Sequence, residues 1–270
     1  MSGTAYPRFT KSQRQQHLVL FVSFTLLALT GLPQKYASAP LGERLINLLG
    51  GIEVVRIVHR LSAVVLMGAT LVHVLDVGYG ILVRGCPVRM WFGAKDVKDA
   101  WQTLRYNLGW AQARPRMGRF TFEEKVEYWS LLWGTVIMVG TGFALWNPIA
   151  TARILPGQFI PAALAAHGGE ALLAVLAVVI WHGYGVHLRH FNRSMFTGSL
   201  SEEEMRDQHP LELEERVADP TGGELPVAVQ ARRLKWFLPA AAVFSLLFII
   251  AVYAFVTFEQ TALTTISPPG

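Results

Sequence analysis

Histidines are the residues of this 270-residue chain most suited to chemistry, because six of the eight lie in or beside long apolar segments. An ionisable side chain at membrane depth is costly and usually functional. His59 and His73 are 14 residues apart in one segment, and His167 and His182 are 15 apart in another. Both spacings are close to four α-helical turns, so each pair shares one helix face, about 21 Å apart along the axis. Because b-type haem iron takes one imidazole from each side, two such helices could hold two haems.

A further histidine, His17, opens the first apolar segment at the level expected for His73 and His182. Three histidines are therefore available for the two axial positions of one haem, and the spacing alone leaves their pairing open. His187 and His190 follow His182 and are expected to be polar residues of the membrane interface.

Small and basic residues beside the histidines also suit a haem. Small residues would leave room for a porphyrin, although they equally allow transmembrane helices to pack closely. They are Gly68, Gly168, Gly169, Ala174 and Ala177. Arg56 and Arg60 lie next to His59, and each guanidinium could pair with a haem propionate or extend to the lipid headgroups.

The elements that must position these residues are transmembrane helices. The chain is 52% apolar and only 16% charged, whereas about a quarter of the residues of a soluble domain are charged. This composition excludes a disordered chain, a nucleic-acid-binding tail and an ordinary soluble enzyme. It predicts an all-α polytopic membrane protein, because the apolar segments approach the length needed to cross a bilayer. The expected helices are residues 15–33, 54–83, 124–146, 162–190 and 236–258.

Basic residues predict the orientation of these helices. Nineteen Lys and Arg residues lie in the N-terminal tail and in segments 84–125 and 189–235, and only five lie elsewhere. The positive-inside rule then places the N-terminus in the cytoplasm and the C-terminus in the periplasm of a bacterial cytoplasmic membrane. The single cysteine, Cys86, excludes an internal disulfide and a CxxCH motif, so any haem is expected to be held non-covalently.

The two basic segments contain the longest polar stretches. The first is expected either to form an interfacial helix, with Trp91, Trp101, Leu104 and Leu108 toward the membrane, or to be an ordinary connector. The second, around residues 200–226, is expected to be a solvated arm, and His209 within it to be solvated as well.

Four stretches resemble the prokaryotic membrane cytochrome b family, which includes the gamma subunit of formate dehydrogenase and the cytochrome b subunits of nickel-iron hydrogenase and thiosulfate reductase. The stretches are QHLVLFVSFTLLALTGLP, IVHR, KVEYWS and HGG…WHGYGVHLRHFN. The resemblance implies that residues 1–210 form a four-helix bundle with two b haems and a quinone site near the cytoplasmic haem. It also implies that His59 and His167 bind the outer haem and that His17 and His182 bind the inner one. Residues 211–235 are then a cytoplasmic linker, and 236–258 an additional helix.

The resemblance places a quinone-site segment at Tyr106–Gly109, which includes Asn107 and Gly109. A site for menaquinone or ubiquinone also needs polar groups at the cytoplasmic interface to bind its carbonyls. The available groups are Glu124, Lys125 and Glu127 before the third helix, with His187 and His190 on the fourth. Lys125 and Glu127 could instead be ordinary charges at a helix end.

His73 and the fifth helix depart from the family pattern, so a third haem bound by His73 stays open. We expect an electron-transfer subunit without a catalytic domain of its own. Its partners would be the quinone pool, the membrane lipid and a periplasmic redox subunit, either a molybdopterin/iron-sulfur enzyme or a multihaem cytochrome c. The main alternative is a proton-coupled or metal-ion transporter, for which Asp76 and Glu170 are the candidate intramembrane carboxylates. A membrane hydrolase is disfavoured, since the sequence contains neither HExxH nor GxSxG.

Overall fold

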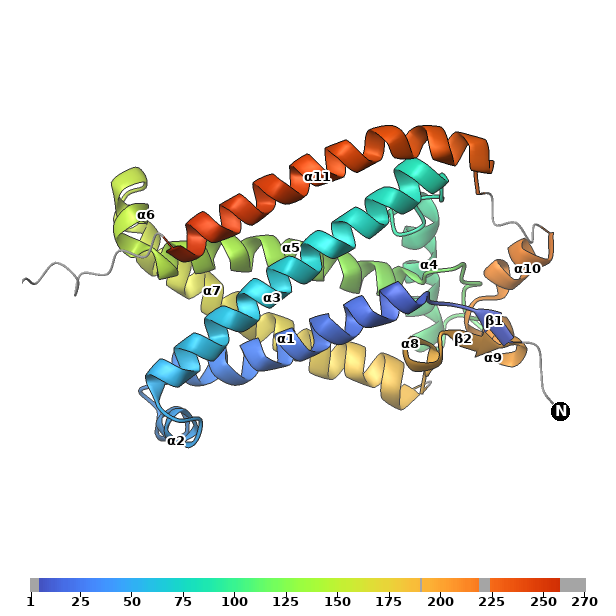
Figure 1. Ribbon diagram of the computed structural model, residues 1–270. Helices are drawn as coiled ribbons and strands as arrows, with labels where there is room; N and C mark the ends of the chain where they lie inside the picture. The colour runs from blue at the N-terminus through green and yellow to red at the C-terminus, as the bar shows by residue number, and fades with distance from the viewer. Residues whose placement is uncertain (1–4, 190, 219–223, 258–270) are drawn as a thin grey trace, which may run out of the picture. The chain divides into compact units, whose positions relative to one another are not determined.

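The computed structural model describes residues 5–189, 191–218 and 224–257. Within these residues, five helical segments are long and apolar enough to cross a membrane (Figure 1). They are Lys11–Lys35, Ile52–Arg84, Phe122–Trp146, Phe159–Leu188 and Val227–Thr257. The prediction of an all-α membrane protein with five spans is confirmed. The fifth span begins at Val227 rather than at residue 236, because the polar turn before the apolar run is helical too.

Helices account for nearly all the regular structure. The spans consist of α1 (Lys11–Lys35), α3 (Ile52–Tyr79) with the π-helix η1 (Gly80–Arg84), α5 (Phe122–Trp146), α7 (Phe159–Leu176) with the π-helix η2 (Ala177–Arg189), and α11 (Val227–Thr257). The shorter elements are β1 (Ala5–Pro7), α2 (Pro40–Leu48), α4 (Ala94–Asn107), α6 (Pro148–Ile154), α8 (Ser194–Thr197), β2 (Ser199–Ser201), α9 (Glu202–Gln208) and α10 (Pro210–Ala218).

Apolar side chains on the spans are largely exposed, as expected where lipid rather than water surrounds them. Helix α11 contains no buried residue, and Leu246, Leu247 and Ile249 are each more than half exposed. Pro33 in α1 and Pro239 in α11 lie inside helices, a position that membrane helices tolerate better than soluble ones.

The described chain divides into two compact units. The first unit comprises residues 1–15, 74–131 and 191–240, and the second comprises 16–73, 132–190 and 241–270. The chain contributes several separate segments to each unit, and the expected domain 1–210 and linker 211–235 stay a prediction. The expected linker itself contains most of α10 and the first turns of α11.

The first unit contains a folded polar cluster where a solvated arm was expected. Strand β1 pairs antiparallel with β2, with Tyr6 opposite Leu200, and α9 and α10 follow directly. Leu200 is 1% exposed and His209 only 2%. The His209 ring nitrogen Nδ1 lies 2.8 Å from the carbonyl oxygen of Gly118. The expectation that His209 is solvated is therefore wrong, because the acidic segment folds back on the N-terminal strand.

Helix α4 forms at the start of the first basic segment, as expected for an interfacial helix. The Gly93 N–H donates to the Asp96 carboxylate at 2.7 Å, which satisfies a free amide at the helix start. The side chains of Trp91, Trp101, Leu104 and Leu108 are all at least 47% exposed. Contact of this surface with the membrane stays a prediction.

Candidate functional site

Two pairs of histidines face each other in the second unit, and each pair joins two different helical segments. His59 of α3 and His167 of α7 have ring centroids 6.3 Å apart, with 66° between the ring planes. His17 of α1 and His182 of η2 have ring centroids 6.4 Å apart, with 37° between the planes. All four side chains are partly buried. The structure thus brings four of the five predicted axial histidines together as two separate pairs.

The separation within each pair indicates what could lie between the rings. A direct hydrogen bond between two ring nitrogens, about 3 Å long, would put the centroids about 5 Å apart. Two imidazole–metal bonds of about 2.0 Å would put the centroids about 6.2 Å apart, because each centroid lies about 1.1 Å behind its nitrogen. The observed 6.3 and 6.4 Å leave room for the second arrangement, and they also lie within the range of about 4.5–7 Å for ring pairs in ordinary contact.

The number of ligands distinguishes a haem from a bare metal ion. A protein-bound zinc ion takes three or four protein ligands, whereas haem iron takes four nitrogens from the porphyrin and needs only two from the protein. Across the part of the chain that the structure describes, no group of three or more His, Cys, Asp or Glu side chains is placed to hold a metal ion. Each facing pair of histidines provides the two protein ligands that a haem iron takes.

Two threonines support the pair His59–His167. Thr30 Oγ1 on α1 lies 2.9 Å from His59 Nδ1, and Thr141 Oγ1 on α5 lies 2.9 Å from His167 Nδ1. Each threonine is followed by a glycine, Gly31 or Gly142, and each glycine also lies against the same imidazole. The sequence analysis did not identify these residues, although the Thr-Gly dipeptide recurs in two apolar segments and could have indicated them.

His73 has a different partner from the four paired histidines. Its Nδ1 lies 2.9 Å from the side-chain oxygen of Gln16, the residue that precedes His17. The structure therefore pairs His182 with His17 and joins His73 to the helix that carries His17. This arrangement agrees with the pairing implied by the resemblance, and it leaves His73 beside the pair.

The π-helix η2 brings His187 against His182. The two ring centroids are 6.0 Å apart, with 85° between the planes. On an α-helix a residue five positions ahead points about 140° away, but a π-helix hydrogen-bonds residues i and i+5 and so brings them onto one side. The expected α-helix over 162–190 is thus a π-helix in its second half.

Three cations lie on the histidine-bearing helices or beside them. The Arg60 guanidinium lies 4.6 Å from the centre of the Trp146 ring, and exposed Arg56 forms an ion pair with Glu53 at 3.3 Å. Lys35 was not predicted from the sequence. Its Nζ lies against Gly168, where an added Cβ would be only 2.8 Å away, so this glycine provides space for the ammonium next to His167.

Lys125, predicted as a quinone residue, is fully engaged within the first unit. Its Nζ donates to the two Asp96 carboxylate oxygens at 2.8 and 2.9 Å and to the Trp91 carbonyl at 3.1 Å. Burial alone would raise the pKa of Asp96, but the hydrogen bonds from Lys125 and from the Gly93 amide lower it. These three hydrogen bonds use the three donors of the ammonium, so Lys125 anchors α4 to α5, and its contact with a quinone stays a prediction.

The other predicted quinone residues are spread over both units. Asn107 is exposed at the end of α4, Gly109 follows with a φ of 75°, and Glu127 is partly buried in α5. These three residues belong to the first unit, whereas exposed His187 belongs to the second. His190 lies outside the described residues. Glu124 has a structural role, because it pairs with Arg8 at 3.3 Å and caps α5 by accepting from the Thr121 amide.

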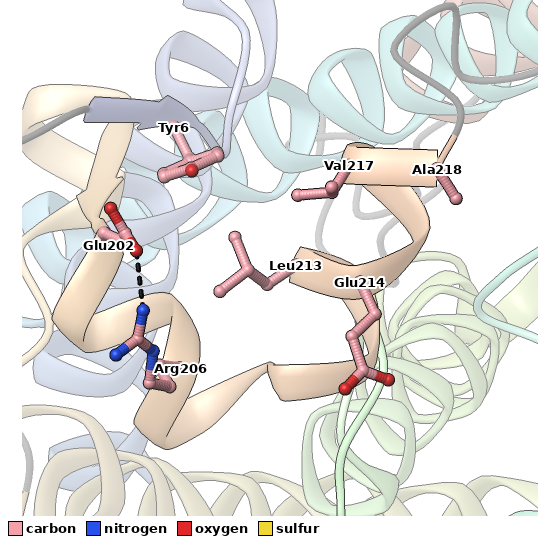
Figure 2. Close-up of a pocket in the computed structure, with 7 residues that line it drawn as sticks. All are labelled: Tyr6, Glu202, Arg206, Leu213, Glu214, Val217 and Ala218. Carbon is pink, nitrogen blue, oxygen red and sulfur yellow. Dashed lines mark hydrogen bonds and ion pairs between the residues drawn. The ribbon is translucent and has the colours of Figure 1, made fainter.

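A separate hollow of about 400 Å³ lies in the first unit, lined by α9, α10 and Tyr6 of β1 (Figure 2). Its polar groups include Glu202 and Arg206, which are joined to each other at 2.7 Å. Its apolar wall includes Leu213 and Val217. None of the histidines that the structure describes lines this hollow, so it is separate from the facing histidine pairs.

Neither a scan of protein-family models nor a search of curated proteins finds a match to the chain.

Proposed function

We propose that this chain is the b-type cytochrome subunit of a membrane oxidoreductase, which passes electrons between the quinone pool and a periplasmic redox partner. The two facing histidine pairs support this proposal most strongly, since each pair would supply the two protein ligands that a haem iron takes. The resemblance of four stretches to the prokaryotic membrane cytochrome b family supports it independently.

Residues of the second unit would bind two haems. His59 and His167 would bind one iron, and His17 and His182 the other. Haem, when bound, supplies reversible one-electron chemistry at its iron. Arg60 and Lys35 would neutralise propionates near the outer pair, and the apolar spans would keep water away from both sites.

Quinone would bind at the end of the spans where the basic segments lie. Within the first unit, Asn107 would hydrogen-bond a quinone carbonyl, Glu127 would exchange protons, and the tight turn at Gly109 would let the backbone approach. The positive-inside rule predicts that this side faces the cytoplasm of a bacterial cytoplasmic membrane, and the redox partner would then bind on the periplasmic side.

One optical spectrum tests the class of protein. The purified chain in detergent should show sharp b-type bands in a reduced-minus-oxidised spectrum, and pyridine haemochrome should count two haems per chain. Acid acetone should extract all the haem, because the single cysteine excludes a CxxCH attachment. A colourless protein, purified from cells with ample haem, would overturn the proposal.

A further inference from the structure

The hydrogen bonds of the Thr30 and Thr141 hydroxyls determine which ring nitrogen of His59 and of His167 carries the proton. A threonine hydroxyl has one proton to donate. Thr30 donates it to the Leu26 carbonyl at 2.6 Å, and Thr141 donates it to the Ile137 carbonyl at 2.6 Å. With their protons committed to the backbone, both hydroxyls act as acceptors toward the histidines. The Nδ1 atoms of His59 and His167, each 2.9 Å from a hydroxyl oxygen, must then carry the ring protons.

With Nδ1 protonated, Nε2 of each of these two rings keeps its lone pair, and this is the form of histidine that binds a metal.

The glycine after each threonine allows the close approach. A Cβ on Gly31 would lie 3.0 Å from His59 Cε1, and a Cβ on Gly142 would lie 3.4 Å from His167 Cε1. The same Thr-Gly dipeptide thus meets the ligand-bearing helix on both sides: α1 supports α3, and α5 supports α7. Each of the two rings of this pair therefore contacts a threonine hydroxyl and the adjacent glycine of a neighbouring helix.

We propose that Thr30 and Thr141 are positioning residues, which hold His59 and His167 with Nδ1 protonated and Nε2 directed at the outer haem iron. This inference rests on the proposed function, because it assigns a role toward the same haem. A metal-bound histidine usually donates its second ring N–H to a nearby acceptor, which fixes the tautomer and makes the ligand more basic. A more basic ligand stabilises oxidised iron, so both hydroxyls should lower the reduction potential of the outer haem.

The test replaces each hydroxyl by a methyl group of similar size. Thr30→Val and Thr141→Val should each raise the midpoint potential of one haem, alter its low-spin electron paramagnetic resonance signal and leave the other haem unchanged. Haem affinity at that site should fall about 10- to 100-fold, as is usual when such a supporting residue is lost. Because both threonines act on one iron, the double variant should shift the same haem further than either single variant.

Two controls separate this role from ordinary helix packing. Thr30→Ser and Thr141→Ser keep the hydroxyl and should restore the wild-type potential and spectrum. Thr70→Val removes a threonine of α3 that makes the same bond to the carbonyl four residues earlier, from Oγ1 to Leu66 at 2.9 Å. That control should leave both haems unchanged.

Each outcome points one way. Wild-type haem spectra with unchanged potentials in both valine variants would overturn the inference and leave the proposed function intact. An equal shift in Thr70→Val would overturn it as well. If a valine variant loses the haem altogether, failure of the matching serine variant to recover it would refute the role of the hydroxyl. Absence of haem from the wild type would refute the proposed function itself.

Discussion

A histidine in an apolar helix can be a metal ligand or a hydrogen-bonded packing residue, and its immediate partner distinguishes the two. His17 faces His182 across 6.4 Å, a distance suited to a shared iron. His73 belongs to neither facing pair, and its Nδ1 is bonded to Gln16. At the residue scale, the pairing of rings is therefore more informative than the spacing of histidines along one helix.

The first prediction separates these two histidines. His17→Ala should lose one of two haems per chain, because an axial ligand is removed. His73→Ala should keep both, because the two facing pairs do not include His73 and its Nδ1 is bonded to Gln16. Pyridine haemochrome per chain and the number of potentiometric waves measure the result. Loss of a haem in His73→Ala with retention in His17→Ala would reverse the assignment.

The second prediction compares the effects of replacing Gly31 and Gly142 by alanine. Gly31→Ala should disturb the outer haem more than Gly142→Ala, because its new methyl group would lie 3.0 Å from His59 Cε1 rather than 3.4 Å from His167 Cε1. The closer distance forces the ring to move, whereas the longer one lies at the edge of normal van der Waals contact. Haem occupancy and the electron paramagnetic resonance spectrum of each variant provide the comparison. Equal behaviour of the two variants would contradict this ranking.

At the scale of elements, buried charges hold α10 in the first unit. The Glu212 carboxylate is 2% exposed and accepts from Arg8 at 2.7 Å, Arg119 at 2.6 Å and Arg216 at 2.8 Å. Burial alone would raise the pKa of Glu212, but Arg119 and Arg8 lower it below its ordinary 4.5. Burial and the charge of Arg8 lower the pKa of His209 below its ordinary 6.5.

The third prediction concerns acid. Since the unfolded segment binds a proton at His209 more readily than the folded one, docking of α10 should weaken as the pH falls below 6.5. The contribution of Glu212 is complete above pH 4.5 and is lost only as the pH falls through its lowered pKa. Hydrogen exchange in residues 199–218, corrected for intrinsic rates, should therefore be faster at about pH 5.5 than at about pH 7.5. An unchanged protection would contradict the assignment to His209.

The fourth prediction removes the Glu212 charge at constant shape. Glu212→Gln leaves three guanidinium groups around a neutral side chain, and breaking a buried pair in this way typically costs about 3–5 kcal/mol. Residues 199–218 should lose protection at every pH. Glu202→Gln is the matched control, because its ion pair with Arg206 is exposed and should contribute little. Equal losses in the two variants would show that the burial of Glu212 is unimportant.

At the scale of the whole molecule, five spans and the distribution of basic residues together predict the topology. A reporter fused after Gly270 should be active only if it works in the periplasm, because an odd number of spans follows a cytoplasmic N-terminus. A reporter inserted in the segment between α4 and α5 should show the opposite activity and is the control. A cytoplasmic C-terminus would mean that α11 does not cross the membrane.

The sequence by itself determined the class of protein, since apolar runs of sufficient length have one stable form in a bilayer. It also identified the histidines, because ionisable residues stand out in such runs. It left the inner pairing open, since periodicity describes one helix and not its neighbours. It gave no indication that α7 continues as a π-helix, because a 3.6-residue repeat was assumed throughout.

Only the tertiary structure decided which helices face each other. It paired His17 with His182, bonded His73 to Gln16, and placed Thr30 and Thr141 on the outer pair, since each contact joins helices that are remote in sequence. It also buried His209, because the acidic segment pairs with β1 and places Glu212 among three arginines, contacts that join residues remote in sequence. The spacing of residues along the chain predicts which side chains share one helix face. The packing of helices determines which residues that face contacts.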